Sequence, residues 1–179
     1  MNLRVLLALV VVLVATGCGT TTQTGNTVTY RDAATGPDMD LLLDNLLESQ
    51  EDRSYLVWLN AVRSRDGAWD AKYYLEARYQ GASDAGFMEI GPGDALVLTV
   101  DGQTMRFRGP GSQENRKVLG NGQFVENAVF EVKADDLRRI AKAKDVKVQI
   151  NGDRRRMYRE FNAENFQKFR SFVLLHMGY

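Results

Sequence analysis

The alternation of apolar and polar residues along the chain predicts mainly β-strands. Between positions 69 and 79, aromatic and aliphatic residues hold the odd positions, while charged residues and one tyrosine hold the even ones. A period of two over such a length is typical of a strand with one buried face. Residues 55–62 are almost wholly apolar, which predicts a strand covered on both of its faces.

The second half of the chain contains further strands separated by turn residues. An Asp-Gly pair within 96–108 and an Asn-Gly pair within 146–161 each separate two alternating segments. Such pairs are strong signals for β-hairpins, because both residues tolerate the backbone conformation of a tight turn. One more strand is predicted at 124–132.

Three segments predict helices instead. At 38–50, Asp38 is a suitable N-cap, and the apolar residues that follow share one helical face: Met39, Leu42, Leu43, Leu46 and Leu47. A short helix is predicted at 134–144. Asn162 is expected to cap a terminal helix on which one face carries Phe166, Phe169 and Val173.

Together these elements predict an α+β fold. Consecutive hairpins imply antiparallel pairing, so we expect a mainly antiparallel curved sheet or partial barrel of about seven strands. The C-terminal helix is expected to pack on this sheet.

The N-terminus carries a targeting signal. One positive charge precedes an uninterrupted apolar stretch at 5–14, which is too short for a helix that spans roughly 30 Å of hydrocarbon. Small residues then lead to the only cysteine, in the order Val14-Ala15-Thr16-Gly17-Cys18. This segment resembles the lipobox of bacterial lipoprotein signal peptides, although that class usually has leucine where this chain has Ala15.

The resemblance implies cleavage between Gly17 and Cys18 and acylation of Cys18. The fatty chains would anchor the protein in a membrane of the bacterial cell envelope. In the lipoproteins of enteric bacteria, an aspartate directly after the cysteine retains the protein in the inner membrane. This chain has Gly19 at that position, so the resemblance favours the outer membrane, facing the periplasm. We therefore expect a signal peptide at 1–17, the lipidated cysteine and a flexible Thr/Gly-rich tether at 18–29, and one globular domain at 30–179.

Composition excludes several functional classes. The chain has 179 residues, with 23 basic and 23 acidic side chains, so its net charge does not favour nucleic acid. One cysteine and one histidine do not provide a His/Cys metal cluster or an internal disulfide. We expect no cofactor, no metal and no nucleic-acid partner.

No catalytic constellation stands out. His176, the only histidine, lies at the end of the terminal helix, where a cation would complement the helix dipole. The acidic pairs that could act in hydrolysis are Glu89 with Asp94 and Asp135 with Asp136. The second pair begins a predicted helix, where carboxylates stabilise the first turn.

The basic residues gather near the C-terminus. Residues 131–179 carry a net charge of +5, and the rest of the mature chain carries −6. The candidate interaction patch comprises Arg154, Arg155, Arg156, Arg159 and the tyrosine on a polar strand face, Tyr74. Such a patch could meet anionic lipid headgroups or an acidic partner; alternatively, its charges only prevent association between strand edges.

Three functions follow, in order of preference. The first is a non-enzymatic envelope lipoprotein that binds or scaffolds another envelope component. The second is a carrier of a small ligand or lipid, with a cavity between the sheet and the terminal helix. The third is a carboxylate-dependent cell-wall hydrolase.

Overall fold

The computed structural model describes residues 19–32, 37–49, 55–66, 70–82 and 84–178. The expected signal peptide, Gly17, Cys18 and Trp69 lie outside the described residues. The described chain forms these elements: β1 (Gly19–Thr24), β2 (Thr27–Asp32), β3 (Asp38–Leu42), β4 (Leu46–Leu47), β5 (Tyr55–Asp66), β6 (Asp70–Gly81), β7 (Gly93–Val100), β8 (Gln103–Gly109), β9 (Arg116–Val118), β10 (Phe124–Val132), α1 (Ala134–Lys142), β11 (Val146–Asn151), β12 (Arg156–Glu160) and α2 (Ala163–Met177).

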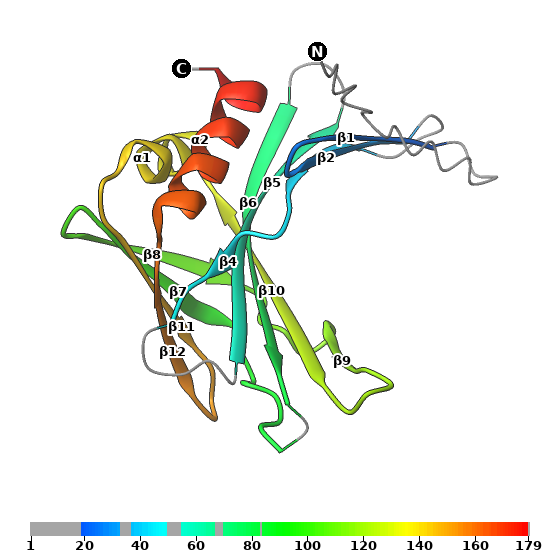
Figure 1. Cartoon of the computed structure of the whole chain (residues 1–179), viewed down its shortest axis with the longest axis vertical. Coiled ribbons are helices and arrows are strands. Elements are labelled where there is room, and N and C mark those ends of the chain that lie inside the picture. The colour runs from blue at the N-terminus through cyan, green and yellow to red at the C-terminus, as the bar shows by residue number, and fades with distance from the viewer. Residues whose placement is uncertain (1–18, 33–36, 50–54, 67–69, 83, 179) are drawn as a thin grey trace, which may run out of the picture.

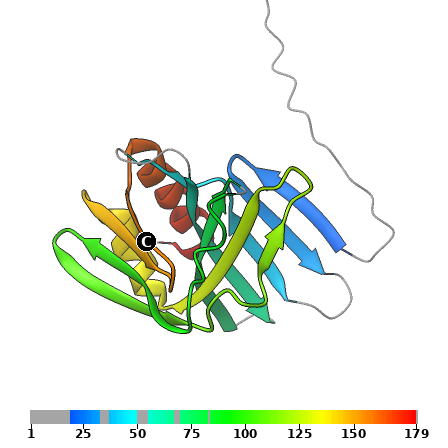
Figure 2. The same ribbon diagram turned by 90° about the horizontal axis from the view of Figure 1, so that it is seen from below.

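The strands form two antiparallel sheets. Sheet A has the order β1-β2-β3-β5-β6-β10-β9, with β4 also paired to β5, and sheet B has the order β12-β11-β7-β8. Sheet B and both helices lie on the same side of sheet A, as Figures 1 and 2 show. The expectation of a mainly antiparallel sheet structure with a C-terminal helix is confirmed. The strands are more numerous than the seven expected, and they form two sheets that are not closed into a barrel.

The hydrophobic core lies between sheet A, sheet B and α2. Its largest members are fully buried and come from all three layers: Leu59, Leu75, Tyr79, Phe130, Leu96, Leu98, Phe169 and Phe172. Burial of such side chains contributes about 1.5–3 kcal/mol each, so this core is the main source of stability. None of the described helices is both long enough and apolar enough to span a membrane.

The predicted turn at Asp101-Gly102 is confirmed. Both residues adopt positive φ, 46° and 80°, which a two-residue hairpin turn requires. The Asp101 carboxylate also accepts the backbone N–H groups of Asp145 and Lys144, each at 2.9 Å. These bonds lower the pKa of Asp101 below its ordinary value, and they connect the turn to the start of β11.

The helix predicted at 38–50 is wrong, because this segment forms β3 and β4. In β3, Asp40 is buried and faces Arg63 of β5, with 3.7 Å between the Asp40 carboxylate and the guanidinium. Asp44 then adopts a φ of 54°, which a helix does not allow. Pairing with β5 therefore prevails over the local helical spacing of leucines.

The segment expected as a flexible tether forms a hairpin. Residues 19–24 and 27–32 pair as β1 and β2, and β2 continues into sheet A by pairing with β3. Gly25 adopts a φ of 58° at the turn. Threonine has a high strand propensity, so a Thr-rich sequence favours a strand when a sheet edge is available.

Candidate interaction surface

The outer face of sheet A, turned away from sheet B and the helices, is rich in apolar and aromatic side chains. Cross-strand partners share a face, so the register places Leu41, Val62 and Tyr74 in one row. Leu46, Trp58 and Arg78 form a second row, and the polar pair of Asn60 and Glu76 lies between the two rows. We name as the apolar face these residues: Val28, Tyr30, Met39, Leu41, Leu46, Leu56, Trp58, Val62, Tyr74 and Val129.

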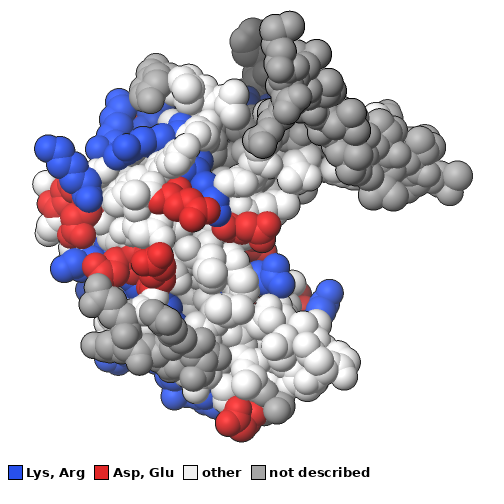
Figure 3. Space-filling model, in the orientation of Figure 1, with Lys and Arg blue, Asp and Glu red and all other residues white. Residues whose placement is uncertain are grey.

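The apolar face is partly open to solvent in the described part of the chain, although Val62 near its middle is only 7% exposed. Tyr30 is 41% exposed, and Leu46 and Leu56 are each 40% exposed. Trp58 and Tyr74 are half-buried by their neighbours within the sheet. This side lies between the β1–β2 hairpin and the β9–β10 hairpin in Figure 1, and the surface in Figure 3 is indented there, with uncharged residues as well as several charged ones along the indentation. Exposed apolar residues that gather on one face, and are not scattered singly, can mark an interaction site.

Polar groups lie within this face, beside Trp58 and between the rows of Trp58 and Tyr74. The Arg78 guanidinium lies 5.0 Å from the centre of the Trp58 ring, within the range of cation–π contacts. Asn60 Nδ2 donates to Glu76 Oε2 at 3.0 Å. Aromatic residues and arginine, which occur together here, are enriched in protein–protein interfaces.

The five residues of the predicted patch do not come together. Arg154 is exposed and forms an ion pair with Glu89 at 2.6 Å. Arg155 is half-buried, and its guanidinium lies 4.8 Å from the centre of the Tyr55 ring. Both arginines precede β12, which begins at the exposed Arg156.

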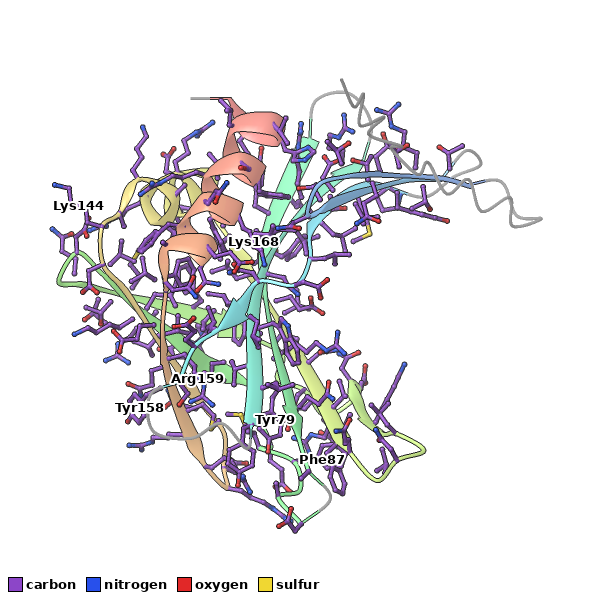
Figure 4. All side chains as sticks on the ribbon, in the orientation of Figure 1. Tyr79, Phe87, Lys144, Tyr158, Arg159 and Lys168 are labelled. Carbon is purple, nitrogen blue, oxygen red and sulfur yellow. The ribbon has the colours of Figure 1, made fainter. Side chains whose placement is uncertain are left out.

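Arg159 contacts the same tyrosine as Arg155 but is buried, and Tyr74 lies on a different sheet. Arg159 is 6% exposed and donates to the Tyr55 carbonyl at 3.1 Å. Its guanidinium therefore connects β12 to β5 inside the fold and is not available at the surface. Figure 4 shows Tyr158 and Arg159 pointing in opposite directions from β12. Tyr74 belongs to the apolar face of sheet A, where it lies beside Val62.

The acidic pairs are engaged in structural contacts. Asp94 forms an ion pair with Arg108 at 3.5 Å, and Glu89 is paired with Arg154 as described. In α1, Asp135 pairs with Arg138 at 2.9 Å. Asp136 accepts the backbone N–H of Lys133 at 3.1 Å and so caps the helix. The first-turn interpretation of this pair is therefore confirmed.

His176 joins a buried charged cluster where α2 meets β3 and β5. Its Nδ1 lies 3.3 Å from Asp40 Oδ2, and Asp40 also accepts the Thr29 hydroxyl at 2.9 Å. Arg63 and Arg65 approach the same carboxylate. Burial lowers the pKa of His176; Asp40 opposes this effect, and the two arginines add to it.

This cluster predicts an acid-sensitive contribution to stability. Because the folded state lowers the pKa of His176, it binds a proton less readily than the unfolded chain. The contribution is present above about pH 6.5, the ordinary histidine value, and is lost as the pH falls below it. Between pH 7 and pH 5 we expect urea unfolding to show a loss of at most about 1.4 kcal/mol per pH unit.

The matched variant for this prediction is His176→Gln, which cannot titrate. It should lose less stability than the wild type over the same pH range, while Asp40, Arg63, Arg65 and Phe172 continue to surround the position. Parallel pH profiles for the two proteins would show that His176 does not carry the effect.

Sequence reasoning missed a buried carboxylate at Glu126 in β10. Its side chain is fully buried and accepts the backbone N–H groups of Met88, Glu89 and Ile90 at 2.7, 3.1 and 2.6 Å. The Ser112 hydroxyl donates to the same carboxylate. A single side chain thus fixes the segment before β7. Strand periodicity does carry a signal, because Glu126 falls on the buried face of β10.

Sequence reasoning also missed three buried asparagines that join α2 to sheet A. Asn165 Nδ2 donates to Asn45 Oδ1 at 3.0 Å and to the Leu46 carbonyl at 2.8 Å. Asn45 Nδ2 donates to the Leu59 carbonyl at 2.8 Å, and its backbone N–H donates to Asn60 Oδ1. Isolated asparagines give no pattern from which such a network could be predicted.

The described side chains give no sign of a metal centre. Within the described ranges, no three Asp, Glu, His or Cys side chains gather in a way that could hold a metal ion. Comparisons with protein-family models, with curated proteins and with solved structures found no match. The apolar face is therefore the candidate functional site on which the following argument rests.

Proposed function

We propose that this protein is a non-enzymatic lipoprotein of the bacterial envelope, anchored through Cys18, that binds another envelope protein through the apolar face. The observation that carries the proposal is the contrast between β5 and its surroundings. The apolar sequence of β5 suits a strand covered on both faces. In the described part of the chain, sheet B and the helices cover only one of them.

The chemistry of the face favours a protein partner. Trp58, Tyr74 and Arg78 are of the residue types that most often dominate the energy of protein interfaces. Met39 and Leu41 extend the apolar area across β3. Most of the arginines near β12, which were candidates for a headgroup contact, already have partners within the chain. Arg154 pairs with Glu89, and Arg155 and Arg159 both contact Tyr55. A partner with a complementary apolar patch fits better than an anionic surface.

Site-specific photo-cross-linking in intact cells tests the docking surface. A photoreactive phenylalanine analogue is placed at Trp58 or Tyr74, and in a control protein at Tyr158. Tyr158 is a suitable control because it is 59% exposed and lies on β12 of sheet B. We expect one discrete adduct from each apolar-face position, at least several-fold stronger than any adduct from Tyr158.

The adducts also decide between occupants. Mass spectrometry of each adduct should identify this chain joined to a different envelope protein. The absence of adducts from both apolar-face positions, or equal adducts from Tyr158, would contradict the proposal. An adduct that contains only two copies of this chain would show that the face mediates self-association. That result would also contradict the proposal of a different envelope protein as partner.

The packing of the interior does not support the carrier alternative. Phe130 of sheet A and Phe169 and Phe172 of α2 are fully buried where that cavity was expected. A groove of about 400 Å³ lies elsewhere, beside sheet B, and Gln149 and Tyr158 belong to its lining. The groove is open and partly polar, unlike the enclosed apolar cavities that hold lipids. The carboxylates of the hydrolase alternative make the structural contacts described above.

A further inference from the structure

Strand β1 presents an unusual edge. It ends sheet A, and the order of strands places no described neighbour on its outer side. Its sequence, Gly-Thr-Thr-Thr-Gln-Thr, contains no charged residue and no proline, and residues 20–24 are exposed. Figure 2 shows β1, the darkest blue strand, at the outer rim of the molecule. Its free backbone groups can therefore pair with another strand.

The remaining edges of the described sheets are protected. Natural proteins prevent edge-to-edge association with charged residues and short strands. Charged residues lie on the other edge strands of three or more residues: Arg106 and Arg108 on β8, Arg116 and Lys117 on β9, and the exposed Arg156 and Glu160 on β12. Strand β4 has only two residues, and the following Glu48 bridges to Glu160. Among the longer edge strands, β1 lacks this protection.

We propose that β1 pairs antiparallel with β1 of a second copy of this chain, so that the two copies of sheet A become continuous. Two identical antiparallel strands are related by a two-fold axis, the commonest symmetry of homodimers. Around Thr22, such a pair places only threonine and glutamine opposite one another. No like charges meet, and cross-strand threonine pairs are favourable. The uncharged edge is thus complementary to itself.

The position of β1 in the chain also favours a second copy as occupant. Gly19, its first residue, directly follows Cys18. In an antiparallel pair of six-residue strands, the two N-terminal ends lie about 20 Å apart, so one membrane surface can hold both. Confinement to that surface raises the effective concentration of each copy for the other. The pairing does not require the apolar face to be a docking surface.

Co-isolation of two differently tagged full-length copies tests the dimer. The copies are expressed together, extracted in a mild detergent and purified through one tag. We expect the second copy in the wild-type preparation and at least a tenfold loss when both copies carry Thr22→Lys, because like charges then meet at the strand centre. Thr104→Lys on the edge strand β8 is the matched control, since Thr104 is also exposed; it should leave the yield unchanged.

A second measurement uses disulfide formation at the same two edges. Thr22→Cys should give a covalent dimer on non-reducing gels from the oxidising envelope, and Thr104→Cys should not. Three results would overturn the proposal: no co-isolation of the wild type, co-isolation that Thr22→Lys does not reduce, or equal covalent dimer from Thr104→Cys. None of them depends on cross-linking to a different protein, so failure here is distinct from failure of the proposed function.

Discussion

Replacement of Glu126 by glutamine is expected to lower the free energy of unfolding by about 3 kcal/mol, since hydrogen bonds to a charged group contribute about 1.5–3 kcal/mol each. Glutamine matches the shape of glutamate but has one acceptor oxygen, and its NH₂ group would face backbone donors. The N–H groups of Met88 and Ile90 approach different oxygens of the carboxylate. At least one of them would be left buried without an acceptor.

Urea unfolding of the variant and of a control on the same strand checks this prediction. Glu131→Gln is the matched control, because Glu131 also lies in β10 but is exposed. It should change the stability by less than about 0.5 kcal/mol, as surface substitutions usually do. Equal shifts in the two variants, or none in Glu126→Gln, would show that the buried contacts are not the source of stability.

Replacement of Cys18 by serine is expected to abolish acylation and, with it, stable attachment to the membrane. Each buried methylene contributes about 0.8 kcal/mol, so two or more fatty chains hold a protein firmly, and their loss leaves no comparable anchor. Cells fed an alkyne fatty acid should label the wild type strongly. They should not label the Cys18→Ser variant, because Cys18 is the only cysteine in the chain.

Membrane fractionation completes the test of anchoring. A blocked lipoprotein signal can remain uncleaved, so residues 1–17 are also exchanged for an ordinary secretory signal in both proteins. With this signal and the Cys18→Ser substitution, the mature chain should appear in the soluble fraction. Equal labelling of the wild type and the Cys18→Ser variant, or unchanged membrane association of the variant with the exchanged signal, would exclude the proposed anchor.

The sequence predicts those elements of this fold whose signals are local. Asp101-Gly102 sets a hairpin by its own conformational preference, and Asn162 caps α2 by accepting the Asn165 N–H at 2.9 Å. The segment at 38–47 could not be predicted in this way. Its leucines fit a helix, but the segment pairs with β5, where Arg63 and Arg65 approach Asp40 from more than twenty positions further along the chain.

The candidate site was harder to predict than the fold. A run of arginines is conspicuous in a sequence, but whether each one is exposed depends on tertiary partners such as Glu89 and Tyr55. For the apolar face, the sequence shows the apolar character of the strand but not which of its faces stays exposed. An apolar strand indicates that both faces need cover, and only the arrangement of sheet B and the helices shows which face they leave open. Alternation predicts that Tyr74 shares a face with the charged residues of its strand, and the structure places it half-buried beside Val62 on the outer face of sheet A.

The hydrogen bond between Asn45 and Asn165 also bears on the order of folding. It joins residues separated by 120 positions, and the contact of His176 with Asp40 spans even more of the chain. Contacts of such long range form slowly, because a large loop must close first. Strand β3 therefore cannot complete its packing until the last helix is available. For a chain exported as proposed, β3 could complete its packing only after the C-terminal helix had also crossed the membrane.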